Sequence, residues 1–140
     1  MQYISKDDLI TYAHERLIDE SAENDSTTLD KIELAQIDII KSYLSSRYNT
    51  EAIFSEDSPV ENEVLKSILA RMVLYRLFKR NAARKVPTDS KEDNDSAKKE
   101  LIDISTGKTP LTDLPPAVDS SGNPVSKSLW GNNSNPNFYI

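Results

Sequence analysis

The chain has 140 residues, enough for one folded domain with a single hydrophobic core. It contains no cysteine, which excludes disulfide bonds, thiolate metal sites and a cysteine nucleophile. The start of the sequence lacks the basic and then apolar pattern of a signal peptide, and no segment approaches the roughly 18 consecutive apolar residues of a membrane-spanning helix. We therefore expect a protein of the cytoplasm that does not contact a membrane.

The formal net charge is −6, but its sign is sorted along the chain. Residues 1–63 carry 15 acidic and 5 basic side chains, whereas residues 64–88 carry 7 basic side chains and no acidic one. Such sorting can steer a partner toward one face or set the polarity of a self-assembling subunit. The alternative is a set of solvated helix faces.

A first helix is predicted to begin at Lys6, because Ser5 is a good amino-terminal cap and Asp8 stands three residues further on. It should be short and fray near residues 15–19. The polar, acidic stretch from Ser21 to Thr28 indicates a surface loop.

A second helix is predicted over residues 28–48, capped by Thr27 or Thr28. Its main apolar stripe includes Ile39 and Tyr43. Leu34 and Ile37 lie outside that stripe and either widen the core face or face a neighbouring subunit. Residues 49–57 should form a loop that Ile53 and Phe54 hold to the body.

The third helix is predicted to begin with Ser58 as its cap, Pro59 in its first position and Glu61 closing a capping box. Residues 64–78 are apolar nearly all round, which is typical of the central helix of a fold. Basic side chains fill its last turns, where the helix dipole favours them, and Pro87 stops it.

A fourth helix is predicted over residues 90–105, with Gly107 as its carboxy-terminal cap. Few apolar residues support it, so we expect it to be the most loosely held helix. Beyond it, five prolines exclude a long helix. We therefore expect an all-α fold: a helical domain of about four helices over residues 1–108, followed by an extended arm rich in Pro, Asn and Ser over residues 109–140.

No pattern in the sequence points to catalysis. The single histidine, His14, has the setting of an ordinary surface or packing residue, and the paired carboxylates are adjacent in sequence and lie in polar surroundings. Three glycines cannot build a phosphate-binding loop of the known kinds, and no cluster has metal-ligand spacing. We expect no enzyme activity, no cofactor and no metal.

The basic end of the third helix is the best candidate for a contact with another macromolecule. One interpretation is an ionic surface that matches the acidic first half of an adjacent subunit, which we prefer because the whole chain is acidic. The other is a nucleic-acid-binding accessory protein that uses residues 71–85 along a phosphate backbone. The candidate residues are Arg71, Arg76, Lys79, Arg80, Arg84 and Lys85.

The arm contains apolar residues that a plain linker does not need: Trp130, Phe138, Tyr139 and Ile140. An extended segment with such anchors can bind along a partner's surface and become ordered as it binds. The alternative is an arm that folds back on its own domain.

The sequence resembles the small neck or head–tail connector proteins of Mu-like tailed bacteriophages. The resemblance extends over roughly residues 1–111, where the order and spacing of four patches match. It does not include the acidic loop at Ser21 to Thr28 or residues 112–140. The patches are Tyr3-Ile4-Ser5-Lys6-Asp7-Asp8-Leu9; Ser42-Tyr43-Leu44 with Arg47-Tyr48; Ala70-Arg71 with Tyr75-Arg76-Leu77; and Leu101, Ile104, Gly107-Lys108 and Leu111.

The resemblance implies a helical adaptor subunit of the virion neck that is made in the host cytoplasm and has no enzyme activity. Its partners would be further copies of itself in a dodecameric ring, the portal protein on one side and tail or neck proteins on the other. DNA would pass through the central channel and could touch the ring without sequence specificity.

Overall fold

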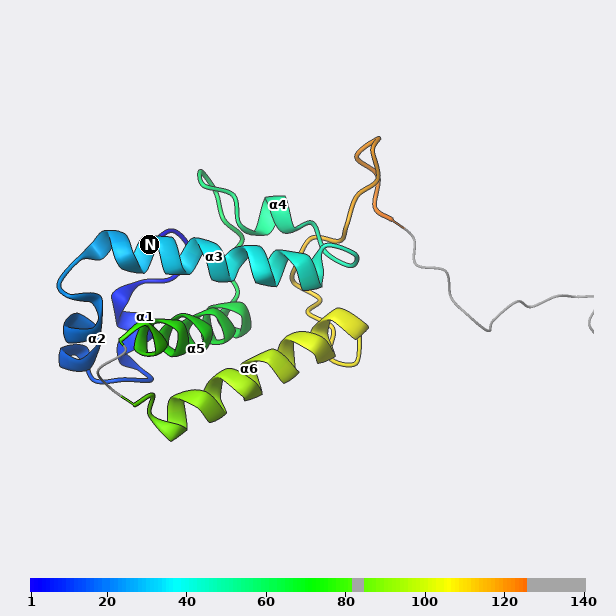
Figure 1. Ribbon diagram of the computed structural model, residues 1–140. Helices are drawn as coiled ribbons and strands as arrows, with labels where there is room; N and C mark the ends of the chain where they lie inside the picture. Colours follow the sequence, from blue (N-terminus) through cyan, green and yellow to red (C-terminus); the bar gives the residue numbers. More distant parts are fainter. Residues whose placement is uncertain (82–84, 126–140) are drawn as a thin grey trace, which may run out of the picture.

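The structure is a computed structural model that describes residues 1–81 and 85–125. These residues form six helices and no named strand, so the prediction of an all-α fold is confirmed. Helix α5 is central, and α1, α2, α3 and α6 pack around it (Figure 1). The helices are α1 Lys6–Ile10, α2 Glu15–Ala22, α3 Ser26–Leu44, α4 Thr50–Ile53, α5 Glu63–Arg80 and α6 Thr88–Thr106.

The predicted start of the first helix is confirmed, since Ser5 caps α1 in a capping box with Asp8. The predicted loop from Ser21 to Thr28 is wrong. Helix α2 continues to Ala22, and a turn with Glu23 in the left-handed conformation leads directly into α3, which Asp25 caps. The polar composition of this stretch hid the fact that Ser21 and Ala22 are small enough to be buried against the core.

Helix α3 is rotated relative to the predicted apolar stripe. Glu33 is buried within the stripe that faces the core, while Ile39 and Tyr43 are each 40% exposed. The cause lies outside the helix, because the Glu33 carboxylate accepts the backbone N–H groups of residues 2–4. Ile37 is buried and widens the core face, whereas Leu34 is exposed.

Helix α5 begins four residues later than its sequence pattern predicts. The cap is Asn62, whose side chain accepts the Leu65 N–H at 3.0 Å, and the Ser58–Pro59–Glu61 pattern is not used. Residues before Asn62 are held outside the helix, because the Val60 N–H donates to the Ile53 carbonyl at 3.0 Å. Ile53 and Phe54 are buried as predicted, although α4 forms one short helical turn there.

Helix α6 runs along α5, and the two share the most extensive contact of any helix pair (Figure 1). The expectation that this helix is the most loosely held is therefore wrong. Ala97, Leu101 and Ile104 are buried on α5, and Gly107 caps the helix as predicted with φ of 80°.

Residues 109–125 lie beside the end of α3 and form no helix. The Asn49 N–H donates to the Pro115 carbonyl at 2.9 Å, and the Ala117 N–H donates to the Arg47 carbonyl at 3.1 Å. Leu114 is buried. The first half of the predicted arm is thus attached to the body.

Candidate functional site

The basic end of α5 is an exposed cationic surface. Arg76, Lys79 and Arg80 are exposed and spaced by three and four residues, which places them on one side of the last two turns. Lys79 Nζ lies 5.7 Å from the centre of the Tyr75 ring, within range of a cation–π contact. Lys85 is exposed beyond the helix. We call these four cations the basic end; none of them is paired with a carboxylate in the described part of the chain.

Arg71 occupies a different position from the other predicted contact residues. It is only 8% exposed, and its guanidinium donates to both carboxylate oxygens of Glu100, at 3.0 and 2.8 Å. Its Nε also donates to the Ser67 carbonyl at 3.1 Å. The pairing raises the pKa of Arg71 and lowers the pKa of Glu100. Arg71 therefore fastens α6 to α5 and does not extend the basic end.

The remaining predicted contact residues lie outside the residues that the structure describes. These are Arg84 in the connection between α5 and α6, and the arm residues Trp130, Phe138, Tyr139 and Ile140.

The opposite end of α5 is acidic. The segment over residues 51–63 contains five carboxylates and no basic residue, and we call it the acidic segment. Lys41 approaches Glu51 at 3.2 Å, and Lys66 approaches Glu61 and Glu63 at 3.4 and 3.6 Å. Glu56 and Asp57 are exposed and have no basic partner among the described residues. Glu63 in the first turn and Lys79 and Arg80 in the last turn place opposite charges at the two ends of α5, which is about 27 Å long by its helical rise, and Glu56 and Asp57 lie in the loop before it.

Exposed apolar side chains lie on the helices that flank α5. Ile39 and Tyr43, four residues apart on one side of α3, are each 40% exposed, and Ile102 on α6 is 46% exposed. Single exposed apolar side chains are ordinary, but a neighbouring pair on one helix adds apolar area that a partner could cover.

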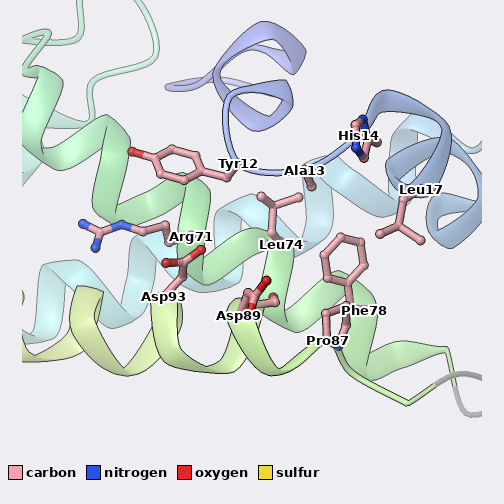
Figure 2. Close-up of a pocket in the computed structure, with 11 residues that line it drawn as sticks. Tyr12, Ala13, His14, Leu17, Arg71, Leu74, Phe78, Pro87, Asp89 and Asp93 are labelled. Atoms are coloured by element: carbon pink, nitrogen blue, oxygen red, sulfur yellow. The ribbon is translucent and has the colours of Figure 1, made fainter.

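A cavity of about 180 Å³ lies where the α1–α2 connection, α5 and the start of α6 meet. Its apolar lining includes Leu17, Leu74, Phe78 and Pro87 (Figure 2). Its polar lining includes Ser90, Asp89 and Asp93 from the first turns of α6. His14 also lines it, in the cap position of α2, where its side chain makes no capping hydrogen bond.

Two other findings bear on function. Residues 1–81 and 85–125 contain no group of three or more His, Asp or Glu side chains that could hold a metal ion. No helix within the same residues is long and apolar enough to cross a membrane.

Sequence reasoning missed two features. The cavity has no sequence signal, because it depends on three segments that meet only in the fold. Glu33 gives a weak signal, as a carboxylate in line with Leu29, Ile37 and Ile40, but its partners are about thirty residues away in the sequence.

Comparison with family models gives a match to "Bacteriophage Mu, Gp36" over residues 3–126. Comparison with curated proteins and with solved structures gives no match. The match confirms the resemblance to Mu-like phage proteins and corrects its extent, since residues 112–126 are also part of the family pattern. With most of its length matched, the chain belongs to the bacteriophage Mu Gp36 family.

Proposed function

We propose that this chain is a structural protein of the virion neck, a head–tail connector subunit that forms a ring between the portal and the tail. The observation that carries the proposal is the charge polarity of α5 in an all-helical body: the acidic segment leads into its first turn, and the basic end lies at its last turns. Membership of a phage protein family supports it. No catalytic activity and no cofactor are part of the proposal.

A ring requires two different, complementary surfaces on each subunit, so that every copy meets the next in the same way and the rotation closes. The basic end of one copy would meet the acidic segment of the next. Exposed ion pairs contribute only about 0.2–1 kcal/mol each, so they would set orientation and speed of encounter more than affinity. Apolar burial would have to supply most of the affinity, and Ile39, Tyr43 and Ile102 are available for it.

The proposal specifies which acidic surface of the adjacent subunit the basic end would meet. The sequence indicated the acidic first half of an adjacent subunit, but within that half α3 buries Glu33 and bonds it within the chain. The acidic segment leaves Glu56 and Asp57 exposed, which makes it the better match for the basic end. A dodecameric ring, contacts with the portal and with tail or neck proteins, and assembly in the host cytoplasm complete the proposal by analogy with connector subunits.

The test is the oligomeric state of charge-reversed chains, measured by native mass spectrometry with and without the portal protein. Arg76→Glu with Arg80→Glu should abolish the ring, and adding Glu56→Lys with Asp57→Lys to the same chain should restore it, because both surfaces are then reversed. Lys99→Glu, an exposed reversal on α6, is the control and should leave the ring intact. A chain that stays monomeric with the portal present, or a control that disrupts the ring equally, contradicts the proposal.

A second candidate is a nucleic-acid-binding accessory protein that uses the basic end on DNA. The exposure of Arg76, Lys79, Arg80 and Lys85 favours it. Binding to duplex DNA should then weaken steeply with salt, with a logarithmic slope of about −3 to −4 if all four cations contact phosphates. Neutral variants of the four should flatten that slope. A chain that binds no duplex DNA at low salt excludes this function.

A further inference from the structure

We propose that the cavity between the α1–α2 connection, α5 and α6 receives the side chain of Trp130 from a second copy of this chain. The inference deepens the proposed function and rests on it in one respect, that copies of the chain meet one another. The cavity would then be the binding site of the carboxy-terminal arm, and an aromatic side chain would be its ligand.

The cavity has the size and lining that an aromatic side chain needs. An apolar cavity of about 150 Å³ can hold a benzene molecule, so about 180 Å³ is enough for the larger part of an indole ring. Leu17, Leu74, Phe78 and Pro87 supply apolar contacts. Burying a ring of this size removes a large apolar area from water.

One residue of the lining has a buried polar atom without a hydrogen-bond partner. Ser90 is 9% exposed, and its Oγ is buried with no hydrogen bond to any described residue. A buried hydroxyl without a partner costs about 1–3 kcal/mol, so a ligand that donates one hydrogen bond to it would complete the site. The indole of tryptophan is such a group, since its ring is apolar and its single N–H is a donor.

The charges around the cavity fit the arm. Asp89 and Asp93 line it on the α6 side, and the Arg71 guanidinium, which also lines it, is paired with Glu100. Among residues 126–140 the only charged side chain is Lys127, three residues before Trp130. An arm that inserts Trp130 would therefore bring one cation toward two carboxylates, a favourable arrangement at a solvated rim.

The reach of the arm indicates that the tryptophan comes from another copy. The Val125 N–H donates to the Ala117 carbonyl, and Ala117 is bonded to Arg47 at the end of α3. Residues 118–125 project from that end of the body, opposite the start of α6 (Figure 1). Five extended residues span at most about 18 Å. Ser90 and Thr106 alone are about 24 Å apart along α6, so Trp130 could approach its own cavity only if the arm ran straight back along the body, whereas a second copy can present it without that constraint.

The test uses the full chain with Trp130→Phe, which contains no other tryptophan, and a synthetic peptide of residues 124–140. All tryptophan fluorescence then comes from the peptide. We expect a saturable shift of its emission to shorter wavelength as protein is added. Ala13→Leu, which places a larger side chain in the lining, should abolish the shift, whereas Ala35→Leu, the same change at an exposed position on α3, should not. Ser90→Ala should weaken binding by about 2- to 10-fold.

Competition between peptides identifies which residue of the arm binds, and this experiment requires no further substitution in the folded protein. A peptide with Tyr139→Ala should compete as well as the natural one, and a peptide with Trp130→Ala should not compete. The absence of a saturable shift at millimolar peptide overturns the inference, as does a shift that persists in a folded Ala13→Leu chain or equal competition by the two peptides. A ring that forms without peptide binding refutes only the docking of Trp130, and binding by a chain that never assembles refutes only the ring.

Discussion

Replacing Glu33 with glutamine is the sharpest test of how this fold is held together. Glu33 is 1% exposed, and its Oε1 accepts the backbone N–H groups of Tyr3 and Ile4, both at 2.9 Å. Its Oε2 accepts the Gln2 N–H at 2.5 Å. The carboxylate thus ties the extended start of the chain to the middle of α3, and through it Tyr3 and Ile4 enter the core.

Glu33→Gln keeps one oxygen and replaces the other with an NH₂ group, which cannot accept a hydrogen bond. The bonds to Tyr3 and Ile4 can remain but lose their charge assistance, at about 0.5–1 kcal/mol each. The Gln2 N–H then faces another donor and loses its bond, at about 1–2 kcal/mol. We expect a total loss of about 2–4 kcal/mol from the free energy of unfolding, a large part of the 5–15 kcal/mol that is typical of a domain.

Urea unfolding followed by far-ultraviolet circular dichroism measures this loss. With a slope of roughly 2 kcal/mol per molar urea, the midpoint should fall by about 1–2 M. Asp38→Asn is the matched control, because Asp38 is exposed on the same helix and should shift stability by less than about 0.5 kcal/mol. Equal midpoints for the two variants would refute the role assigned to Glu33.

Two further predictions concern α6. Gly107→Ala should cost about 2–3 kcal/mol in a urea titration and Gly122→Ala only about 1 kcal/mol. Both glycines have φ of 80°, but a Cβ at Gly107 would displace the Arg47 guanidinium, which would lie 2.5 Å from it and donates to the Ser105 and Thr106 carbonyls, whereas a Cβ at Gly122 meets nothing; equal losses would show that these hydrogen bonds add no stability. Glu100→Gln should cost about 1–2 kcal/mol at neutral pH, a value kept small because the Glu100 side chain is 44% exposed. Arg71 holds the pKa of Glu100 below its ordinary value, so this contribution is present above the ordinary carboxyl pKa and is lost as pH falls through the lowered one. The difference between wild type and variant should therefore shrink below about pH 4, and a difference that is constant across an acid titration would contradict this account.

Signals that act within one turn of the chain could be predicted from the sequence. Ser5 caps α1 and Gly107 ends α6 because their effects depend only on backbone geometry within a few residues. The start of α5 was predicted wrongly, although Ser58 and Pro59 form a good local pattern. At this position tertiary contacts override the local pattern. The Val60 carbonyl accepts a hydrogen bond from the Tyr3 hydroxyl at 2.9 Å, and this bond holds Val60 out of the helix.

The same division applies to the candidate site. Arg76, Lys79 and Arg80 could be identified from a local run of bases on a helix end, and the structure leaves all three exposed. Arg71 belongs to the same run in the sequence but is withdrawn by Glu100, which lies 29 residues further along the chain. A pairing at that separation has no local signature, because it depends on how α6 lies along α5.

Helix α5 separates charges of opposite sign along one axis. A helix converts sequence distance into axial distance at about 1.5 Å per residue, so Glu63 in its first turn and Lys79 and Arg80 in its last turn stand at opposite ends. Because α5 is also the helix that the others surround, their packing leaves its two ends as the places where its charges reach solvent. In the proposed assembly, the exposed cations of the basic end and the exposed carboxylates of Glu56 and Asp57 are the unlike charges that two copies bring together. Repetition of that contact produces a ring or an open filament, depending only on the angle between neighbours.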